Sequence, residues 1–409
     1  VELILACLEI GVVAVPVSVK FRNSELEKIF NIIQPRLIIT SWEKKSQVSS
    51  FKFQVSNIEQ FTNSGSECSS PIINYRQKPD DIAAIILTSG TTGIPKAVQL
   101  SYGNFEASCN NWNTFLQFRS NDQFLCCLSI HHIGGLAVLL RALLFNFSVN
   151  LVNDFDAQVV LDTIKHYPIT IISLVPTMLK RILKLDGGLE ELIKLRWILL
   201  GGGPSPEYLL DYCIAEELNI VKVYGMTETC SGTVGLKLLE EPQNKLYAGR
   251  PFSGAKVWTE NDEFQISGPM VMHGYVGEPE TNSIHNTQDL GWIDENGLVY
   301  LDMRRKDLIV SGGENVNPIE VEEALMNISG VTDAAVVGVD DEEWGQKVVA
   351  YIVLNDKSQL TNDAIKETLE EIFTIYKIPK KFIQVPSIPR NELGKIEYEK
   401  LRANLITLN

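Results

Sequence analysis

One short stretch of the sequence carries residue types that bind phosphate. The apolar run Ile85–Leu87 predicts a buried strand, and a loop of small hydroxyl residues and glycines follows it. Glycines let a backbone approach a ligand closely, hydroxyl and N–H groups donate hydrogen bonds to phosphate oxygens, and a lysine adds positive charge. The pattern predicts a phosphate-binding loop, with a polar turn between two strands as the alternative. The loop residues are Thr88, Ser89, Gly90, Thr91, Thr92, Gly93 and Lys96.

This stretch differs from one common phosphate loop and resembles another. A Walker A loop has Lys-Ser or Lys-Thr directly after its second glycine, whereas Lys96 lies three residues after Gly93 and Ala97 follows it. The sequence TSGTTGIPKAV instead resembles the phosphate-binding signature of the adenylate-forming superfamily of acyl-CoA synthetases, luciferases and nonribosomal-peptide adenylation domains. Other motifs of this superfamily follow in its order, so the resemblance covers essentially the whole chain.

Composition excludes several other classes of protein. A chain of 409 residues exceeds a usual single core, so we expect two or more domains. The net charge of -15 argues against general binding to nucleic acid or to an anionic membrane. Seven cysteines without CxxC spacing indicate a reduced, cytoplasmic protein rather than a disulfide framework or a zinc site. No apolar run reaches the length of a transmembrane helix.

Several segments match the nucleotide site of the family. In the family, glycines lie against adenine, a tyrosine stacks on it, a threonine meets the acyl phosphate, a glutamate binds Mg²⁺, and an aspartate and an arginine contact ribose. A single glutamate suits Mg²⁺, which prefers few carboxylates plus phosphate oxygens. Gln288 stands where the family usually has glycine, which leaves the backbone geometry at that point open. The matching residues are Gly201, Gly202, Gly203, Tyr224, Gly225, Thr227, Glu228, Asp289 and Arg304.

Two segments resemble the walls of the family's acyl pocket. His132 matches the histidine of a PxxHxxGL-like segment, which by resemblance sits at the mouth of this pocket, with a satisfied buried histidine as the alternative. The neighbouring pair His131 and His132 lacks the i, i+4 spacing of a metal site on a helix. The residues that match the pocket are His132, Gly135, Ser173, Val175 and Pro176.

Arg141 is a lone cation in the apolar run LAVLLRALL. A buried cation is costly unless it is paired, so two interpretations stay open. Arg141 either extends from a helix end to solvent or pairs with a second carboxylate on the substrate. The stretch HHIGGLAVLLRALL most resembles the o-succinylbenzoate–CoA ligases of menaquinone biosynthesis, whose substrate has a second carboxylate on its ring.

The last third of the chain resembles the hinge and the small domain of the family. Lys306 matches the hinge position, and Gly313 matches the glycine that lines the tunnel for the pantetheine arm of CoA. Lys395 follows a glycine in PRNELGKI, so its spacing alone indicates a surface lysine. The family's PRxxxGKI motif implies instead that Lys395 is the catalytic lysine, which suits a task of neutralising charge where a carboxylate meets a phosphate.

Helix and strand patterns alternate in the first part of the chain, which predicts a parallel α/β sheet. The run Val12–Val19 reads as one of the strands. The resemblance implies an α/β fold with a large domain of stacked, helix-flanked sheets and a β-rich subdomain over 1–302, a hinge at 303–306, and a small, mobile α+β domain over 307–409. Val1 lies inside a helical pattern where similar proteins have a preceding segment, so we expect an opening segment to be missing.

We therefore predict a cytoplasmic acid–CoA ligase that uses ATP, Mg²⁺ and CoA. It would adenylate a carboxylic acid, o-succinylbenzoate, and then form the thioester with release of AMP and pyrophosphate. A medium-chain or aryl acid–CoA ligase is the alternative within the class, and a non-catalytic nucleotide- or acyl-binding module is the alternative outside it. The expected partners are these small molecules and, for assembly, a homo-oligomer, without nucleic acid or membrane insertion.

Overall fold

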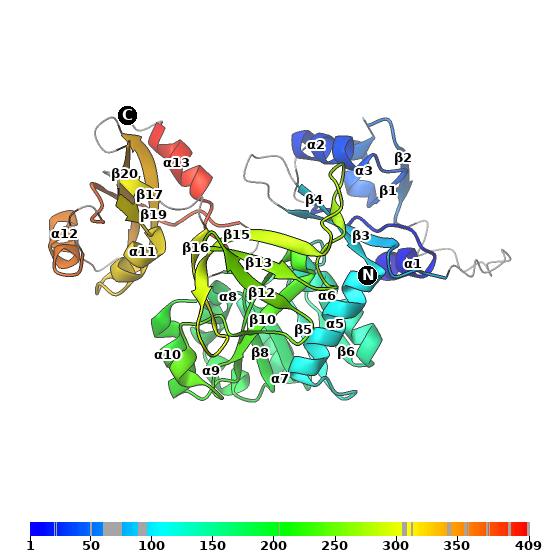
Figure 1. Cartoon of the computed structure of the whole chain (residues 1–409), viewed down its shortest axis with the longest axis horizontal. Coiled ribbons are helices and arrows are strands. Elements are labelled where there is room, and N and C mark those ends of the chain that lie inside the picture. Colours follow the sequence, from blue (N-terminus) through cyan, green and yellow to red (C-terminus); the bar gives the residue numbers. More distant parts are fainter. Residues whose placement is uncertain are drawn as a thin grey trace.

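The fold is described from a computed structural model of the chain. The described residues are 1–19, 21, 23–49, 51–59, 76–88, 96–203, 205–304, 309–311, 314–341, 345–355, 358, 360–373, 375, 377–391 and 394–406. The central sheets and helices lie in the middle of Figure 1, with the last sheet of the chain at one end and the first helices at the other.

Within the described residues, a seven-stranded sheet in the order β11-β10-β9-β8-β7-β5-β6 forms the middle of the molecule. The strands from β6 to β9 run parallel, and β10 and β11 join them antiparallel. Short apolar runs such as Trp197–Leu200 fit such a sheet, because helices cover both of its faces. The strands are β5 (Gln123–Cys126), β6 (Ser148–Leu151), β7 (Ile171–Leu174), β8 (Trp197–Leu200), β9 (Ile220–Met226), β10 (Ser231–Lys237) and β11 (Arg250–Pro251).

Two groups of helices cover the two faces of this sheet. On one face, Leu179 and Leu210 pack against strand residues such as Ile172 and Ile198. These side chains belong to helices whose apolar residues recur at helical spacing. The helices of this face are α7 (Ala157–His166), α8 (Pro176–Leu183), α9 (Gly188–Leu192) and α10 (Glu207–Ala215). The helices of the other face are α5 (Tyr102–Leu116) and α6 (Ile133–Phe145).

Helices α5 and α6 lie between this sheet and a second one. Val138 of α6 contacts the core of the seven-stranded sheet, whereas Leu136 and Ala137 pack with Ile86 and Val98 of the second sheet. This explains why α6 is apolar on most of its surface. The second sheet contains β3 (Ile82–Thr88), β4 (Lys96–Ser101) and β14 (Gly274–Tyr275), and α1 (Glu2–Glu9) packs beside it.

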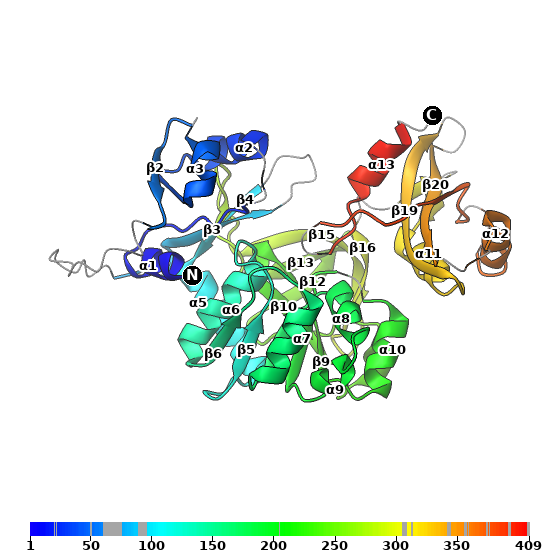
Figure 2. The same cartoon turned by 180° about the vertical axis from the view of Figure 1, so that it is seen from behind.

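A small parallel pair of strands with two helices extends the second sheet. Ile29 and Phe30 pack with Leu87 and Ala97 of β3 and β4. The elements are α2 (Asn23–Ile33), β1 (Leu37–Thr40), α3 (Trp42–Val48) and β2 (Gln54–Asn57). They lie at the far end of the molecule from the last sheet (Figure 2).

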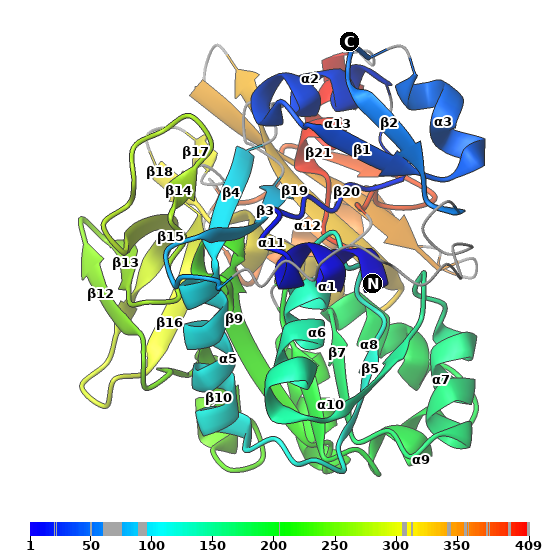
Figure 3. The same ribbon diagram turned by 90° about the vertical axis from the view of Figure 1, so that its right-hand side faces the viewer.

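A β-rich part follows the seven-stranded sheet in the chain and lies beside it (Figure 3). Its antiparallel strands follow the order β12-β13-β15-β16 among the described residues. Phe264 and Val299 join Val234 of β10 in a shared core, which fixes this part against the central sheet. The strands are β12 (Lys256–Glu260), β13 (Glu263–Ser267), β15 (Ile284–Ile293) and β16 (Val299–Arg304). The 3₁₀ turns η1 (Thr227–Thr229) and η2 (Pro242–Asn244) flank β10 of the seven-stranded sheet.

The last sheet of the chain carries helices on both faces. Ala335 and Val337 of β19 point toward α13, whereas Ala334 and Val336 point toward α11, as the alternation of a strand requires. The strands are β17 (Ile309–Ser311), β18 (Glu314–Val316), β19 (Val331–Asp341), β20 (Gly345–Leu354) and β21 (Lys381–Gln384). The helices are α11 (Pro318–Met326), α12 (Asn362–Glu370) and α13 (Tyr398–Ile406).

The predicted strand at Val12–Val19 is wrong. Ala14 alone pairs with Ala84 in an isolated bridge, where Ala14 donates to Ala83 and accepts from Ile85. Pro16 has no N–H group to donate, so the run cannot continue the hydrogen-bond ladder past this point.

Candidate functional site

The site lies at one edge of the seven-stranded sheet. Neighbouring parallel strands end at the same edge, so the segments that follow them lie side by side. Strand β5 leads to His132, β7 to Val175 and Pro176, β8 to Gly201, and β9 to η1 with Glu228. The carboxyl edge of a parallel sheet is where α/β proteins bind ligands, so the fold itself brings these predicted residues together.

Tyr275 connects Glu228 to the predicted phosphate loop. The Tyr275 hydroxyl donates to Glu228 Oε1 over 2.9 Å, and Lys96 Nζ lies 4.6 Å from the centre of the Tyr275 ring. Thr88 and Lys96 face each other across β3 and β4, so the two ends of the loop lie together. Tyr275 therefore contacts a carboxylate with its hydroxyl and an ammonium group with the face of its ring.

Asp289 is buried and is held by Tyr224. The Tyr224 hydroxyl donates to Asp289 Oδ2 over 2.6 Å, and the Asp289 N–H group donates to Thr287 Oγ1. Gln288 adopts the left-handed conformation with a φ of 58°, which is the conformation that a glycine would take easily. The unusual residue therefore keeps the backbone turn, and Asn286 Oδ1 accepts a hydrogen bond from its N–H group.

His285 is a site residue that the sequence reasoning missed. Burial is the largest influence on its pKa and lowers it, the charge of Glu228 raises it, that of Lys96 lowers it, and that of Asp289 raises it. The charges of three residues that are far apart in the chain therefore act on one imidazole. Strand pairing places His285 opposite Ile266, and no motif spacing could have indicated this.

His132 caps α6 at the acyl side of the site. Burial, the neighbouring His131 and the charge of Lys395 together lower the pKa of His132 to about 4. His132 is therefore neutral at physiological pH. His131 Nδ1 lies 2.7 Å from Ser129 Oγ, the residue that stands in place of the family's proline.

The other residues predicted for the acyl pocket belong to the backbone segments beside His132. Gly135 is buried, with its Cα close to the carbonyl groups of Leu128 and Ser129. The Ser173 carbonyl accepts from Cys127 Sγ, and Val175 and Pro176 begin α8. Gly202, with a φ of 79°, turns the chain after β8 beside Val175.

Arg141 is buried rather than extended to solvent. Its side chain is 2% exposed, its Nη2 donates to Ser231 Oγ over 2.5 Å, and its guanidinium lies 4.3 Å from the centre of the Trp112 ring. The interpretation of a helix-end arginine reaching water is therefore wrong. Its Nε is buried without a hydrogen-bond partner, so the guanidinium is incompletely satisfied.

The backbone around Ser231 is strained. Cys230 has a φ of 52° and Ser231 a φ of 92°, although neither is glycine. Thr229 Oγ1 donates to the Ser231 carbonyl, and Ser231 Oγ accepts from Trp112 Nε1. The hydroxyl that contacts Arg141 therefore belongs to the turn directly after Glu228, and strain of this kind concentrates at functional sites.

The loop that carries Lys395 lies on the acyl side of the site. Gly394 has a φ of 74° and lies so close to Thr177 Oγ1 that a side chain at this position would collide with it. Lys395 itself is exposed, and its charge acts on His132. Gly394 and Lys395 from the last part of the chain thus lie near Thr177 and His132 from its middle.

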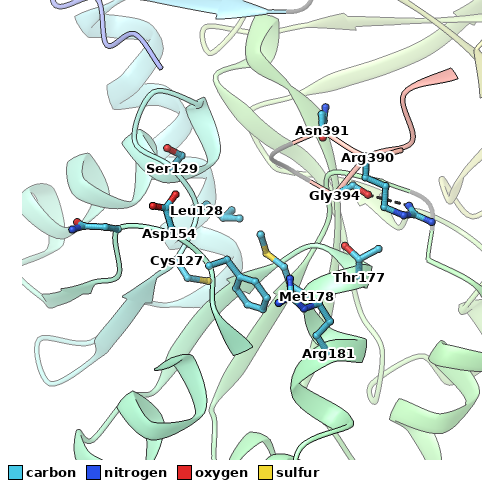
Figure 4. Close-up of a pocket in the computed structure, with 12 residues that line it drawn as sticks. Cys127, Leu128, Ser129, Asp154, Thr177, Met178, Arg181, Arg390, Asn391 and Gly394 are labelled. Carbon is cyan, nitrogen blue, oxygen red and sulfur yellow. Dashed lines mark hydrogen bonds between the residues drawn. The ribbon is translucent and has the colours of Figure 1, made fainter. Parts of the chain in front are cut away.

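A cavity of about 380 Å³ opens beside this loop (Figure 4). Leu128 and Ser129 line it from the segment after β5, Thr177 and Met178 from α8, and Arg390 from the Lys395 loop. Its lining contains none of the residues predicted for the acyl pocket, but Thr177 directly follows Pro176 in α8 and Ser129 precedes His132 by three residues.

The chain matches two family models. Residues 1–276 match the AMP-binding enzyme, and residues 320–395 match the AMP-binding enzyme C-terminal domain.

The chain belongs to the AMP-binding enzyme family.

Relatives with this fold are ligases. The 2-succinylbenzoate–CoA ligase of Oceanobacillus iheyensis is 33% identical over 411 residues, which cover 97% of this chain and 85% of the relative. The o-succinylbenzoate CoA synthetase (MenE) of Bacillus subtilis has been solved in complex with the acyl-adenylate intermediate OSB-AMP. It is 31% identical, with a TM-score of 0.87 over 98% of this chain and 84% of that one. The same enzyme has been solved with ATP and a magnesium ion, with a TM-score of 0.86 over 98% and 86%.

Membership of the AMP-binding enzyme family confirms the predicted superfamily and the predicted fold class. The domain boundaries and the hinge at 303–306 stay predictions. Arg304 ends β16 and pairs with Asp289 across the ladder. Of the helices that the structure describes, none combines the length and the apolar character of a membrane span. The predicted site residues that lie outside the described residues are Ser89, Gly90, Thr91, Thr92, Gly93, Lys306 and Gly313.

The described residues suit the Mg²⁺ that an AMP-binding enzyme uses with ATP. They contain no group of three or more His, Cys, Asp or Glu side chains that could hold a metal alone. Mg²⁺ commonly takes one or two carboxylates and completes its ligands with substrate phosphates and water, which a lone Glu228 beside a phosphate loop would allow.

Proposed function

We propose that this chain is an o-succinylbenzoate–CoA ligase of menaquinone synthesis. It converts the acid and ATP to an acyl-adenylate and pyrophosphate, and then transfers the acyl group to CoA with release of AMP. One observation carries the proposal: Tyr275 contacts both Glu228 and Lys96, at the sheet edge that also carries Tyr224 bonded to Asp289. The relatives named above catalyse or bind the intermediates of this reaction.

Charge repulsion is the first barrier of the reaction. The substrate carboxylate attacks the α-phosphorus of ATP, so two anions must approach each other. Lys96 on the phosphate side and Lys395 on the acyl side supply positive charge at the two ends of the junction. Glu228 would hold Mg²⁺, which when bound offsets the charge of the phosphates. Neutral His132 shapes the pocket mouth without attracting the carboxylate away from Lys395.

The remaining residues orient the nucleotide. Asp289 presents its carboxylate with one oxygen already bonded to Tyr224, and a carboxylate has acceptor capacity left for ribose hydroxyls. Tyr224 is thereby fixed at the end of β9 for stacking on adenine. Gly201, Gly202, Gly203 and Gly225 border the same position, and Thr227 begins η1 toward the acyl phosphate.

Arg141 is the proposed contact for the second carboxylate of the acid. It is buried on the same side of the sheet as the turn after Glu228, and its Nε has no partner. A monocarboxylic acid has no need of this charge. A medium-chain or aryl acid–CoA ligase, the second candidate, would therefore use Arg141 only as a structural residue.

The arrangement of the chain resembles the one that forms adenylate. The double mutant of the Bacillus subtilis enzyme bound to the product analogue OSB-NCoA matches with a TM-score of 0.69, against 0.87 for the OSB-AMP complex. The two complexes cover the same 98% of this chain, so they differ in how their parts are placed. We infer that rotation about Lys306 withdraws Lys395 and brings Gly313 to the site for the second half-reaction.

The reaction belongs in a reducing compartment, which we take to be the cytoplasm. The described cysteines are all free thiols, and burial raises the pKa of most of them. Light scattering of the purified chain would establish whether it forms the predicted homo-oligomer.

ATP–pyrophosphate exchange over a panel of acids tests the proposed function. o-Succinylbenzoate should support exchange at least tenfold faster than medium-chain and simple aryl acids at equal concentration. Faster exchange with one of the other acids would favour the second candidate. Nucleotide binding without exchange for any acid would favour a non-catalytic binding module.

A further inference from the structure

The loop that presents Lys395 is bonded to itself. Asn391 N donates to the Lys395 carbonyl, Lys395 N donates to Asn391 Oδ1, and Arg390 pairs with Ile396 across the loop. The described residues at the two ends of the loop are therefore bonded to one another. The orientation of these residues depends on the two points where they join the rest of the small domain.

The first point is an ion pair. Arg390 Nη2 donates to both carboxylate oxygens of Asp333, over 2.7 and 2.9 Å, and Arg390 Nη1 donates to the Gly394 carbonyl over 3.0 Å. Asp333 lies on β19, which is the edge strand of this sheet within the described residues. Nη2 holds the carboxylate and Nη1 holds the Gly394 carbonyl, so one guanidinium ties the loop to this strand and limits the direction in which the loop leaves the sheet.

The second point is a buried carboxyl group. Glu322 on α11 is 8% exposed, and its Oε1 accepts from the Val336 N–H group of β19 over 2.7 Å. The Tyr398 hydroxyl lies 3.1 Å from Glu322 Oε1 and 3.3 Å from Oε2. Tyr398 comes three residues after Lys395 and begins α13. Glu322 therefore joins α11, β19 and α13 at the place where the loop returns to the domain.

We propose that Glu322 and Tyr398 are positioning residues for adenylate formation, because they fix one end of the Lys395 loop while Arg390 and Asp333 fix the other. The inference rests on the proposed function for the role of Lys395. It concerns a group that never touches the substrate and acts only through the orientation of the lysine.

The surroundings of Glu322 keep it protonated near neutral pH. Burial raises its pKa to about 8, the hydrogen bonds from Val336 and Tyr398 and the charge of Arg390 lower it, and the charge of Asp333 raises it. Between the ordinary value of 4.5 and about 8, the folded chain therefore binds one more proton here than the unfolded chain. Stability from this group is complete below that window and is lost as the pH rises through it.

Two matched tyrosine variants test the positioning role. Tyr398→Phe removes the hydroxyl that reaches Glu322, whereas Tyr351→Phe removes a hydroxyl that donates to the Leu401 carbonyl further along the same helix. Tyr398→Phe should slow ATP–pyrophosphate exchange about tenfold, the usual effect of one hydrogen bond, and leave thioester formation from supplied acyl-adenylate within twofold. Tyr351→Phe should leave the ratio of the two rates unchanged. Equal loss of both half-reactions in Tyr398→Phe, or no loss, would overturn the proposal.

Hydrogen exchange gives a readout that does not depend on activity. Amide exchange of a peptide spanning 389–398 should become about tenfold faster in Tyr398→Phe and stay unchanged in Tyr351→Phe. Unchanged amide exchange in both variants would refute the positioning role, even in a chain that forms no adenylate. Faster amide exchange in Tyr398→Phe, together with no ATP–pyrophosphate exchange by the unmodified chain, would instead count against the proposed function.

The carboxamide variant Glu322→Gln separates shape from charge. It keeps an acceptor for Val336 and Tyr398 and stays neutral at every pH, so its rate of ATP–pyrophosphate exchange at pH 7 should stay within threefold of that of the unmodified chain. Its thermal midpoint should match that of the unmodified chain at pH 4 and exceed it increasingly up to pH 8.5. A constant offset across this range would show that Glu322 does not titrate as a buried acid.

Discussion

At the scale of single residues, Tyr275 is the side chain that unites the phosphate side of the site. Its hydroxyl anchors Glu228 and its ring carries Lys96, so removal of the hydroxyl frees the carboxylate that would bind Mg²⁺. Tyr275→Phe should lower kcat/KM for ATP about tenfold and raise the Mg²⁺ concentration needed for half-maximal exchange. Tyr167→Phe on the exposed end of α7 is the control. An unchanged Mg²⁺ requirement in Tyr275→Phe would contradict this role.

We propose that Arg141 determines which acid the chain accepts. Arg141→Met keeps the volume and removes the charge, so it should lower kcat/KM for o-succinylbenzoate by about 30-fold or more, as expected for a broken buried charge pair. The comparison acid is 4-oxo-4-phenylbutanoate, which lacks the ring carboxylate, and its kcat/KM should change less than threefold. Equal losses for the two acids would show that Arg141 supports the Ser231 turn instead of the substrate.

The role of a site residue could be predicted where the residue belongs to a motif. It could not be predicted where strand pairing brings the residue to the site. Glu228, Asp289 and Lys96 could be assigned because their segments match a family in order. Tyr275 and His285 could not, because neither has a role in a motif: Tyr275 reaches the site through the pairing of β14 with β4, and His285 through the pairing of β15 with β13. Lys395 shows both sides: its spacing indicates only a surface lysine, and its proximity to His132 depends on how two domains meet.

At the scale of elements, the turn before Asp289 shows how the chain keeps a functional geometry with an unfavourable residue. Gln288 holds a left-handed conformation that costs a residue with a side chain about 1 kcal/mol. Gln288→Gly should therefore raise the free energy of unfolding by up to about 1 kcal/mol and leave exchange activity within twofold. Denaturant unfolding measures the first and the exchange assay the second. A large loss of activity would mean that the Gln288 side chain itself serves the site.

Elements were predictable where the sequence pattern suffices without partners. Trp197–Leu200 is a strand, and Asn317 caps α11 with Pro318 at its first position, both as the residue types indicate. Val12–Val19 has the apolar pattern of a strand, yet Pro16 interrupts the ladder. An apolar pattern does not show which backbone N–H groups a neighbouring strand needs. The interruption of the ladder at Pro16 therefore appears only when that strand is known.

At the scale of the whole molecule, we propose that a lysine from a separate domain completes one site. The large domain supplies the sheet edge with the nucleotide residues, and the small domain supplies a short, doubly anchored loop. The match to the acyl-adenylate complex describes one arrangement of these parts. We propose a second arrangement for thioester formation, because Lys395 lies on the acyl side that a thiol must reach.

Lys395→Ala tests this central claim most directly when the two half-reactions are measured separately on the full chain. Formation of the acyl-adenylate from o-succinylbenzoate and ATP should fall by at least about 100-fold, because the charge at the junction of the two anions is lost. Thioester formation from supplied acyl-adenylate and CoA should stay within threefold of the unmodified chain. Equal loss of both half-reactions, or an unaffected first half-reaction, would contradict the account.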